Sequence, residues 1–298
     1  MTTTRDAVNR RSDVEADGDT GSTGTTGTAV MTTWRTRALD YLVQPRLWFE
    51  IVLLAVLYIV YSFIRNLVHS DRTQAFDNGR AILDWQDGLH LSLERPLNDL
   101  VDAIPAIAAV SAVIYASLHF IVTPVVLGWL FISHPKNYRF FSTALIITTG
   151  LALIGFFLLP SAPPGLFGDE GCVDIMAKTG SWGWWPESGT PASDAVSNPY
   201  AAMPSLHCAW ATWCGIMLVT FSRRTWLRVL GGVYPFVTYF VVMGTANHYF
   251  LDVLAGLATL ACGTALAVGA RHLWRWYLAR HVEVVTAPVE GSPADSGQ

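Results

Sequence analysis

The chain has 298 residues, of which 52% are hydrophobic and only 14% are charged. Soluble domains carry about 25% charged residues, and the apolar residues here gather in long runs, so the composition indicates a membrane protein. The formal net charge of −4 shows no basic excess of the kind that nucleic-acid binding needs, and we expect no nucleic-acid partner. The cysteines match neither a disulfide framework nor a zinc-binding spacing: Cys172, Cys208, Cys214 and Cys262.

The two ends of the chain differ in composition from the part between them. Residues 1–34 are rich in Thr, Gly, Asp and Ser and lack the apolar core of a signal peptide, and residues 282–298 have a similar composition. Such segments bury too little apolar surface to fold, so both are predicted to be disordered tails. The membrane domain is predicted to occupy residues 35–281.

Six apolar runs are long enough to cross a bilayer as helices, each needing about 20 residues. They are Leu47–Ile64, Ile107–Ile132, Phe141–Leu159, Ser205–Phe221, Leu227–Gly244 and Tyr249–Trp274. The predicted fold class is therefore all-α, a polytopic bundle of six transmembrane helices. Between the first two runs, Asn66–Pro105 mixes leucines with charges and is predicted to hold an amphipathic surface helix. Between the third and fourth, Pro160–Pro204 is predicted to be an ordered interfacial loop.

Basic residues predict the orientation of the spans, because loops rich in Lys and Arg stay in the cytoplasm. With six spans, four basic segments fall on one side: both flanks of the domain and the turns after the second and fourth runs. The Pro160–Pro204 loop holds only Lys178. Both termini are therefore predicted to be cytoplasmic, in a multi-pass plasma-membrane protein. Three arginines between the first two runs oppose this orientation: Arg72, Arg80 and Arg95.

Ionisable residues mark the predicted outer ends of two spans. His248 and Asp252 are four residues apart, so on a helix they share a face and can form a hydrogen bond. A carboxylate that holds one imidazole nitrogen fixes the tautomer and raises the basicity of the other, which makes His248 a candidate nucleophile or base. His207 is then free to act as a general acid. These three are the candidate catalytic residues.

A candidate phosphate site stands at the start of the fourth run. Pro204 suits the first turn of a helix, and Ser205 follows it. The unpaired N–H groups of such a helix start bind phosphate well, and the Ser205 hydroxyl adds a further donor. The pattern indicates a phosphoester substrate at the membrane surface.

Other interpretations stay open on residue types alone. A histidine at a span end is commonly an interfacial anchor, and a His–Asp pair can be merely a satisfied pair. The position of His119 near mid-span indicates a buried hydrogen-bonded histidine or a packing contact rather than a third catalytic group. A non-catalytic transporter or scaffold is a second hypothesis, although transporters place charges at mid-membrane. A metal-dependent hydrolase is a third, although no HExxH motif is present.

Two stretches carry a resemblance to a known family. AAMPSLH, followed after a long gap by HYFLD, resembles the second and third motifs of the type 2 phosphatidic acid phosphatase (PAP2) superfamily. Pro-Ser-Leu-His and His-Tyr-x-x-Asp in this form are most similar to its inositolphosphotransferase (inositol phosphorylceramide synthase) branch. The resemblance covers about residues 119–274.

The resemblance implies a lipid phosphatase or phosphotransferase that requires no metal or other cofactor. It implies that His248 forms a phosphohistidine, that Asp252 orients it, and that His207 serves as acid and then as base. Ser205 resembles a phosphate contact. The implied donor is a membrane phospholipid or an isoprenoid- or sphingolipid-like phosphoester, and the implied acceptor is water or an alcohol such as inositol.

The chain departs from the superfamily in its basic residues. The phosphatases carry Lys and Arg-Pro in a first motif and Ser-Arg ahead of the third-motif histidine. Here the corresponding third-motif positions hold Val241 and Val242, and no Lys or Arg follows closely after PSAPPGLFG. The missing third-motif arginine is also expected in the transferase branch, which it favours slightly. The phosphate clamp has no assigned residue, and Lys178 is the basic residue of the adjoining loop.

Overall fold

The computed structural model describes residues 72–168, 172–183 and 200–282, together with residues 47–48, 50–52, 55–56 and 59. All of them belong to one compact unit, Asp40–Gln298. Most of the first predicted span and, apart from Val282, both predicted tails lie outside the described residues.

The described part of the chain is built from helices. The long ones are α5 (Pro105–Ser133), α6 (Pro135–Leu158), α8 (Leu206–Phe221), α9 (Thr225–Gly244) and α10 (Phe250–Val282). The shorter ones are α3 (Arg72–Gly88), α4 (Glu94–Ala103), a 3₁₀ turn (Pro164–Phe167) and α7 (Ile175–Thr179). Strand-like pairing among these residues is limited to a single bridge between Ser161 and Ala201. The all-α prediction is confirmed for this part, and the segment predicted to hold one surface helix holds two, α3 and α4.

Four of these helices, α5, α6, α9 and α10, are long and apolar enough to cross a bilayer. The protein is therefore membrane-embedded. Helix α8 is apolar but has only 16 residues. At 1.5 Å per residue it spans about 24 Å, less than the hydrocarbon core of about 30 Å. Because the first predicted span lies largely outside the described residues, the predicted count of six spans is not confirmed.

Prolines and a serine set the helix starts. Helices α5 and α6 begin at Pro105 and Pro135, where the missing N–H of proline costs no helical hydrogen bond. The prediction that Pro204 lies in the first turn of α8 is wrong, because the helix begins at Leu206 with Ser205 as its N-cap. The ring of Pro204 lies against α6 instead, so close that a Cβ on Gly155 would collide with it.

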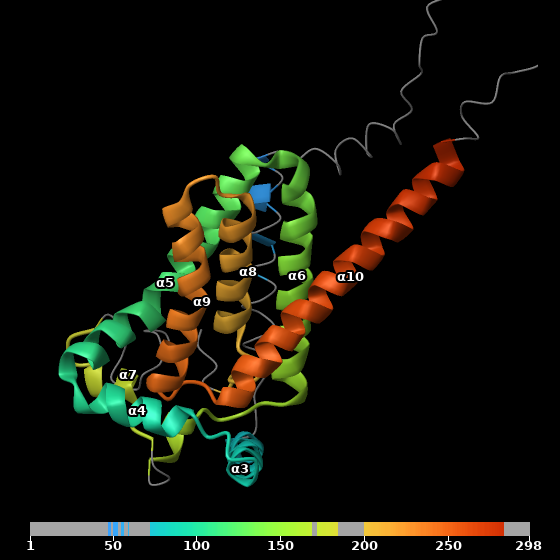
Figure 1. Cartoon of the computed structure of the whole chain (residues 1–298). Helices are drawn as coiled ribbons and strands as arrows, with labels where there is room; N and C mark the ends of the chain where they lie inside the picture. The colour runs from blue at the N-terminus through green and yellow to red at the C-terminus, as the bar shows by residue number, and fades with distance from the viewer. Residues whose placement is uncertain are drawn as a thin grey trace, which may run out of the picture. The chain divides into compact units, whose positions relative to one another are not determined.

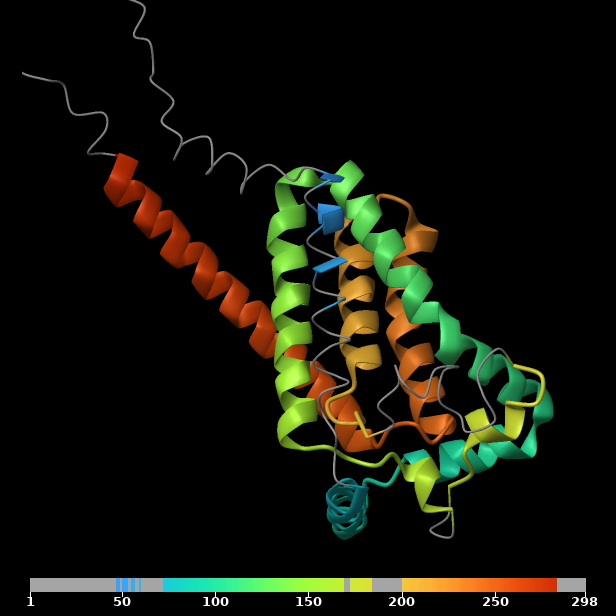
Figure 2. The same ribbon diagram turned by 180° about the vertical axis from the view of Figure 1, so that it is seen from behind.

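The long helices run alternately up and down, so that their turns gather at two ends. Figures 1 and 2 show the α5–α6 and α8–α9 turns at one end, called the upper end after Figure 1. At the lower end α6 and α9 finish, α8 and α10 begin, and α3, α4 and α7 lie beside them. At the upper end the rings of His134 and Phe221 lie 5.1 Å apart and link the two turns.

Helix α8 is the centre of the packing, since it contacts α5, α6, α9 and α10. Its buried Trp213 and Met217 share a core cluster with Leu130 of α5 and Leu260 of α10. Helices within a membrane approach closely where residues are small. Gly263 of α10 is such a position, because a Cβ there would lie 2.9 Å from the Thr148 Cα of α6.

The close crossing of α6 and α10 can be tested with one methyl group. Gly263→Ala is expected to push the helices apart and to lower the free energy of unfolding by about 1–3 kcal/mol, as overpacking does. Gly269→Ala is the matched control, since a Cβ at Gly269 in the same helix meets open space. Thermal unfolding in detergent should show a lower melting temperature for the first variant alone. Equal melting temperatures would contradict the crossing.

Candidate active site

His207, His248 and Asp252 lie together at the lower end. His207 stands in the first turn of α8 and Asp252 in the first turn of α10. His248 stands in the turn Thr245–Tyr249 between α9 and α10, called the His248 turn below. The His248 Nε2 atom lies 3.4 Å from the His207 Nδ1 atom. The structure thus brings together all three predicted catalytic residues.

The Asp252 carboxylate holds His248 from behind. Asp252 is fully buried, and its Oδ2 lies 3.2 Å from His248 Nδ1 and accepts a 3.0 Å hydrogen bond from the Tyr249 N–H. The second bond is a helix-capping contact, made by the third residue of α10 to the residue before the helix. A carboxylate at Nδ1 favours the tautomer with its proton there, so the Nε2 lone pair of His248 faces His207.

The His248 turn is held by contacts from outside itself. Ala246 has a φ of 58°, a left-handed conformation that non-glycine residues adopt at a cost of about 1 kcal/mol or more. Its carbonyl accepts a 2.8 Å hydrogen bond from the Gly165 N–H, and the Val242 carbonyl accepts from the His248 N–H at 3.1 Å. The position of His248 is therefore imposed by α9 and by the loop around Gly165.

Ser205, the predicted phosphate contact, is fully buried and caps α8. Its Oγ accepts from the Cys208 N–H at 3.4 Å, and its own N–H donates to the Asp252 backbone oxygen at 3.1 Å. No hydrogen bond joins the N–H groups of Leu206 and His207 to other described residues. The hydroxyl thus caps the helix, while the N–H groups of Leu206 and His207 have no acceptor among the described residues, as is usual for the first N–H groups of a helix.

Two aromatic rings of α5 flank His207. Tyr115 stacks on the His207 ring with centroids 4.8 Å apart, and His119 meets it edge-on at 4.2 Å. His119 does pack against a neighbour, as its sequence position indicated, but that neighbour is the candidate general acid. The two α5 rings restrict the rotation of the imidazole.

Three polar residues of α3 and α4 were missed in the sequence and lie fully buried beside the His248 turn: Gln86, Glu94 and Asn98. Gln86 donates to Glu94 Oε1 at 2.6 Å, and Glu94 Oε2 accepts from the Phe250 N–H at 3.3 Å. Burial raises the pKa of Glu94, and the hydrogen bonds that it accepts oppose the rise. The sequence did contain a signal for these three residues, because they are polar at positions where an amphipathic helix is expected to be apolar.

Basic side chains near the lower end have partners of their own. Lys178 pairs with Asp102 at the end of α4 and is 47% exposed. Arg95 pairs with Asp87 at 2.9 Å. The guanidinium carbons of Arg72 and Arg80 in α3 lie 5.4 Å and 5.8 Å from the ring centres of Phe76 and Phe167. Within the described residues these contacts assign no basic side chain as the missing phosphate clamp, and no cluster of three or more His, Cys, Asp or Glu residues suits a metal ion.

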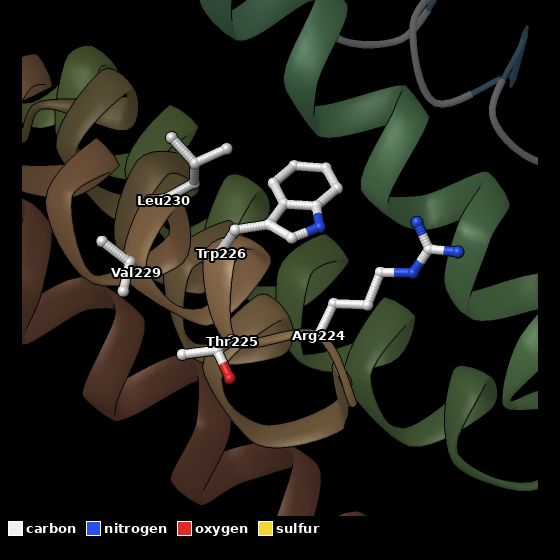
Figure 3. Close-up of a pocket in the computed structure, with 5 residues that line it drawn as sticks. All are labelled: Arg224, Thr225, Trp226, Val229 and Leu230. Carbon is white, nitrogen blue, oxygen red and sulfur yellow. The ribbon is translucent and has the colours of Figure 1, made fainter.

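Apolar hollows lie away from the three residues. One of about 910 Å³ at the start of α9 is lined by Arg224, Thr225, Trp226, Val229 and Leu230, as Figure 3 shows. Another, of about 340 Å³, separates α5 from α9 and is lined by residues such as Ile107 and Phe240. Neither is lined by His207 or His248, whose rings contact each other directly.

Comparison with known proteins gives one match. A family model of the PAP2 superfamily matches residues 80–266, which is more than half of the chain and includes Gln86, Glu94, His207, His248 and Asp252. The match confirms the resemblance at the level of the superfamily and does not identify the branch. Searches of curated proteins and of solved structures found no match.

The capping role of Ser205 predicts a loss of stability on truncation. Ser205→Ala removes the side-chain acceptor of the Cys208 N–H, and loss of such a cap costs about 1 kcal/mol of unfolding free energy. In a domain of this size we expect the melting temperature in detergent to fall by about 2–4 °C. Ser133→Ala, at an exposed position on α5, is the control. An unchanged melting temperature for Ser205→Ala would show that the cap contributes nothing.

Proposed function

Because the chain belongs to the PAP2 superfamily, whose members are generally phosphatases or phosphotransferases, we propose that it transfers a phosphoryl-linked group from a lipid phosphoester through a phosphohistidine at His248. The observation that carries the proposal is the 3.4 Å contact between His248 Nε2 and His207 Nδ1, with Asp252 behind His248 Nδ1. The proposed nucleophile, His248, thus contacts the orienting carboxylate of Asp252 through one ring nitrogen and the acid–base residue His207 through the other.

The proposed reaction has two displacements at phosphorus. First, His248 Nε2 attacks, the N–P bond forms, the P–O bond to the leaving alcohol breaks, and His207 gives its proton to that oxygen. Next, the acceptor hydroxyl gives its proton to His207 while its oxygen attacks phosphorus and the N–P bond breaks. Asp252 accepts the His248 Nδ1–H bond in both steps and stabilises positive charge on the ring. An entering phosphoryl group has to part the two imidazoles.

The charge of the site favours a phosphodiester donor. We propose that the N–H groups of Leu206 and His207 bind the phosphate oxygens at the start of α8. Among the described residues, no Lys or Arg forms a hydrogen bond or ion pair with His207, His248 or Asp252. Such a site balances the single charge of a diester better than the charge of about −1.5 to −2 on a monoester. This favours the inositolphosphotransferase type of reaction, from a phospholipid to an alcohol such as inositol, over phosphatase activity.

We propose that the reaction takes place at the outer face of the plasma membrane, with both termini in the cytoplasm. The upper end of the bundle carries Lys136 and Arg139 at the start of α6 and Arg223 and Arg224 in the α8–α9 turn, and the histidine pair lies at the opposite end (Figure 1). Basic loops stay on the cytoplasmic side.

The roles of the two histidines predict different behaviour with an activated donor. With a p-nitrophenyl phosphodiester, whose p-nitrophenolate leaves without a proton, His207→Ala should still form the phosphoenzyme but discharge it about 10²–10⁴-fold more slowly. His248→Ala should form none. Acid-labile, alkali-stable phosphohistidine, trapped after rapid mixing, measures both. His272→Ala, at an exposed position on α10, is the control.

Three results would contradict these roles. Phosphoenzyme formation by His248→Ala would assign the nucleophile elsewhere. Discharge of the phosphoenzyme at the wild-type rate in His207→Ala would remove the proposed base. Full turnover by both variants would exclude the mechanism as a whole.

The acceptor decides between transferase and hydrolase. We expect purified protein with a radiolabelled phospholipid to produce a new phosphodiester when inositol is supplied, and to release little labelled water-soluble phosphate in its absence. Thin-layer chromatography separates the two products. Release of phosphate that is indifferent to inositol and to other alcohols would show that the enzyme is a hydrolase.

A further inference from the structure

Helix α4 contacts both ends of the His248 turn. The Asn98 side-chain amide donates to the carbonyl of Gly244, the last residue of α9, at 2.9 Å. One helical turn earlier, Glu94 accepts from the N–H of Phe250, the first residue of α10. The two side chains are four residues apart and therefore share a face of α4. The turn that carries His248 is thus fixed to one rigid element at its entry and at its exit.

The start of α10 relies on side chains from elsewhere for its hydrogen bonds. The first N–H groups of a helix have no partner within it. Here Glu94 accepts from the Phe250 N–H at 3.3 Å and Gln86 Oε1 accepts from the Leu251 N–H at 2.8 Å. Gln86 in turn donates to the second Glu94 oxygen. Glu94 and Gln86 therefore satisfy each other and two backbone donors, with each atom in one defined role.

We propose that Gln86, Glu94 and Asn98 are positioning residues that hold the His248 turn so that His248 Nε2 faces His207. The catalytic consequence rests on the proposed function. A nucleophile displaced by about 1 Å can lose on the order of 10²-fold in rate, so the turn has to be held closely. The left-handed Ala246 within the turn does not favour that shape by itself.

The buried, hydrogen-bonded carboxylate of Glu94 is better suited to positioning the His248 turn than to stabilising the fold as a whole. A carboxylate buried without a cation is expensive, and apolar residues of similar size commonly stabilise a fold as well or better. Glu94 is buried in this way and still directs both oxygens at donors in defined places. An oriented polar network specifies one arrangement of the backbone, whereas an apolar contact tolerates several.

The two residues permit an exchange test. Glu94→Gln turns an amide N–H₂ towards the Gln86 N–H₂ donor, and Gln86→Glu places two carboxylates in contact. In the double variant Gln86→Glu/Glu94→Gln, the carboxylate at position 86 accepts from Leu251 and from the amide at position 94, whose oxygen accepts from Phe250. Every donor regains an acceptor in the double variant, so the activity lost in the single variants should be recovered.

The experiment uses the full chain in detergent at pH 8 with a p-nitrophenyl phosphodiester. We expect each single variant to lose about ten-fold or more in kcat, with KM changed less than about two-fold, because a misplaced nucleophile affects reaction more than binding. Amide hydrogen exchange of Phe250 and Leu251 should quicken. The double variant should recover both. Asn98→Asp keeps the acceptor for the Val173 N–H but loses the donor to the Gly244 and Val173 carbonyls, and it should also lower kcat.

Asp99→Asn is the matched control, since it changes an exposed carboxylate to an amide on the same helix. Wild-type kcat in the single variants, or additive losses in the double variant, would overturn the inference. If the wild-type protein turns over no phosphoester, the proposed function fails. Hydrogen exchange at Phe250 and Leu251 then still decides whether the clamp exists: faster exchange in the singles with recovery in the double supports it, and unchanged exchange overturns it.

Discussion

One residue, Asp252, ties the two halves of the candidate site together. Its Oδ2 accepts from the Tyr249 N–H and contacts His248 Nδ1, while its backbone oxygen accepts from the Ser205 N–H. Ser205 caps the helix that carries His207, so the same residue places the proposed nucleophile and the start of the helix with the proposed acid. The hydrogen bond between Ser205 and Asp252 depends on Gly256, one turn further along α10. The Ser205 backbone lies so close to Gly256 that a Cβ at position 256 would collide with the Ser205 carbonyl oxygen.

The arrangement around Asp252 places a second acid in the same buried region. Burial raises the pKa of Glu94, and the negative charge of Asp252 adds to the rise. Neither carboxylate forms an ion pair with Lys or Arg among the salt bridges of the described residues. N–H donors reach both oxygens of Glu94 but only Oδ2 of Asp252, whose Oδ1 has no hydrogen-bond partner among the described residues. In a medium of low dielectric constant such donors act strongly, but only while their geometry holds. Through these hydrogen bonds the surface helices α3 and α4, which lie at the edge of the bundle, are connected to the turn that carries His248.

The sequence predicted helices and motifs well because both depend on local patterns. The run Ile107–Ile132 corresponds to α5, Pro105–Ser133. His248 and Asp252 are in contact, as their four-residue spacing predicted, but they do not share a helix face, because α10 begins at Phe250 and His248 lies in the turn before it. The sequence could not predict the contacts that depend on which helices become neighbours in the fold. Glu94 meets Phe250 across 156 positions of the chain, and nothing local to either residue indicates the other. The place of Pro204, outside the helix, follows from its fit against α6 in the same way.

The charge distribution at the lower end also follows from burial. A Lys or Arg side chain brought into an apolar region without a partner is costly, and here Lys178 and Arg95 pair with Asp102 and Asp87 at exposed positions. A helix start offers an anion two N–H groups and a fraction of a positive charge at no such cost. These donors have a fixed direction, so they select the position of a phosphate group more than its charge. The proposed diester, with its single charge, needs no more than this, so the two histidine motifs are compatible with a site to which the described residues assign no basic clamp.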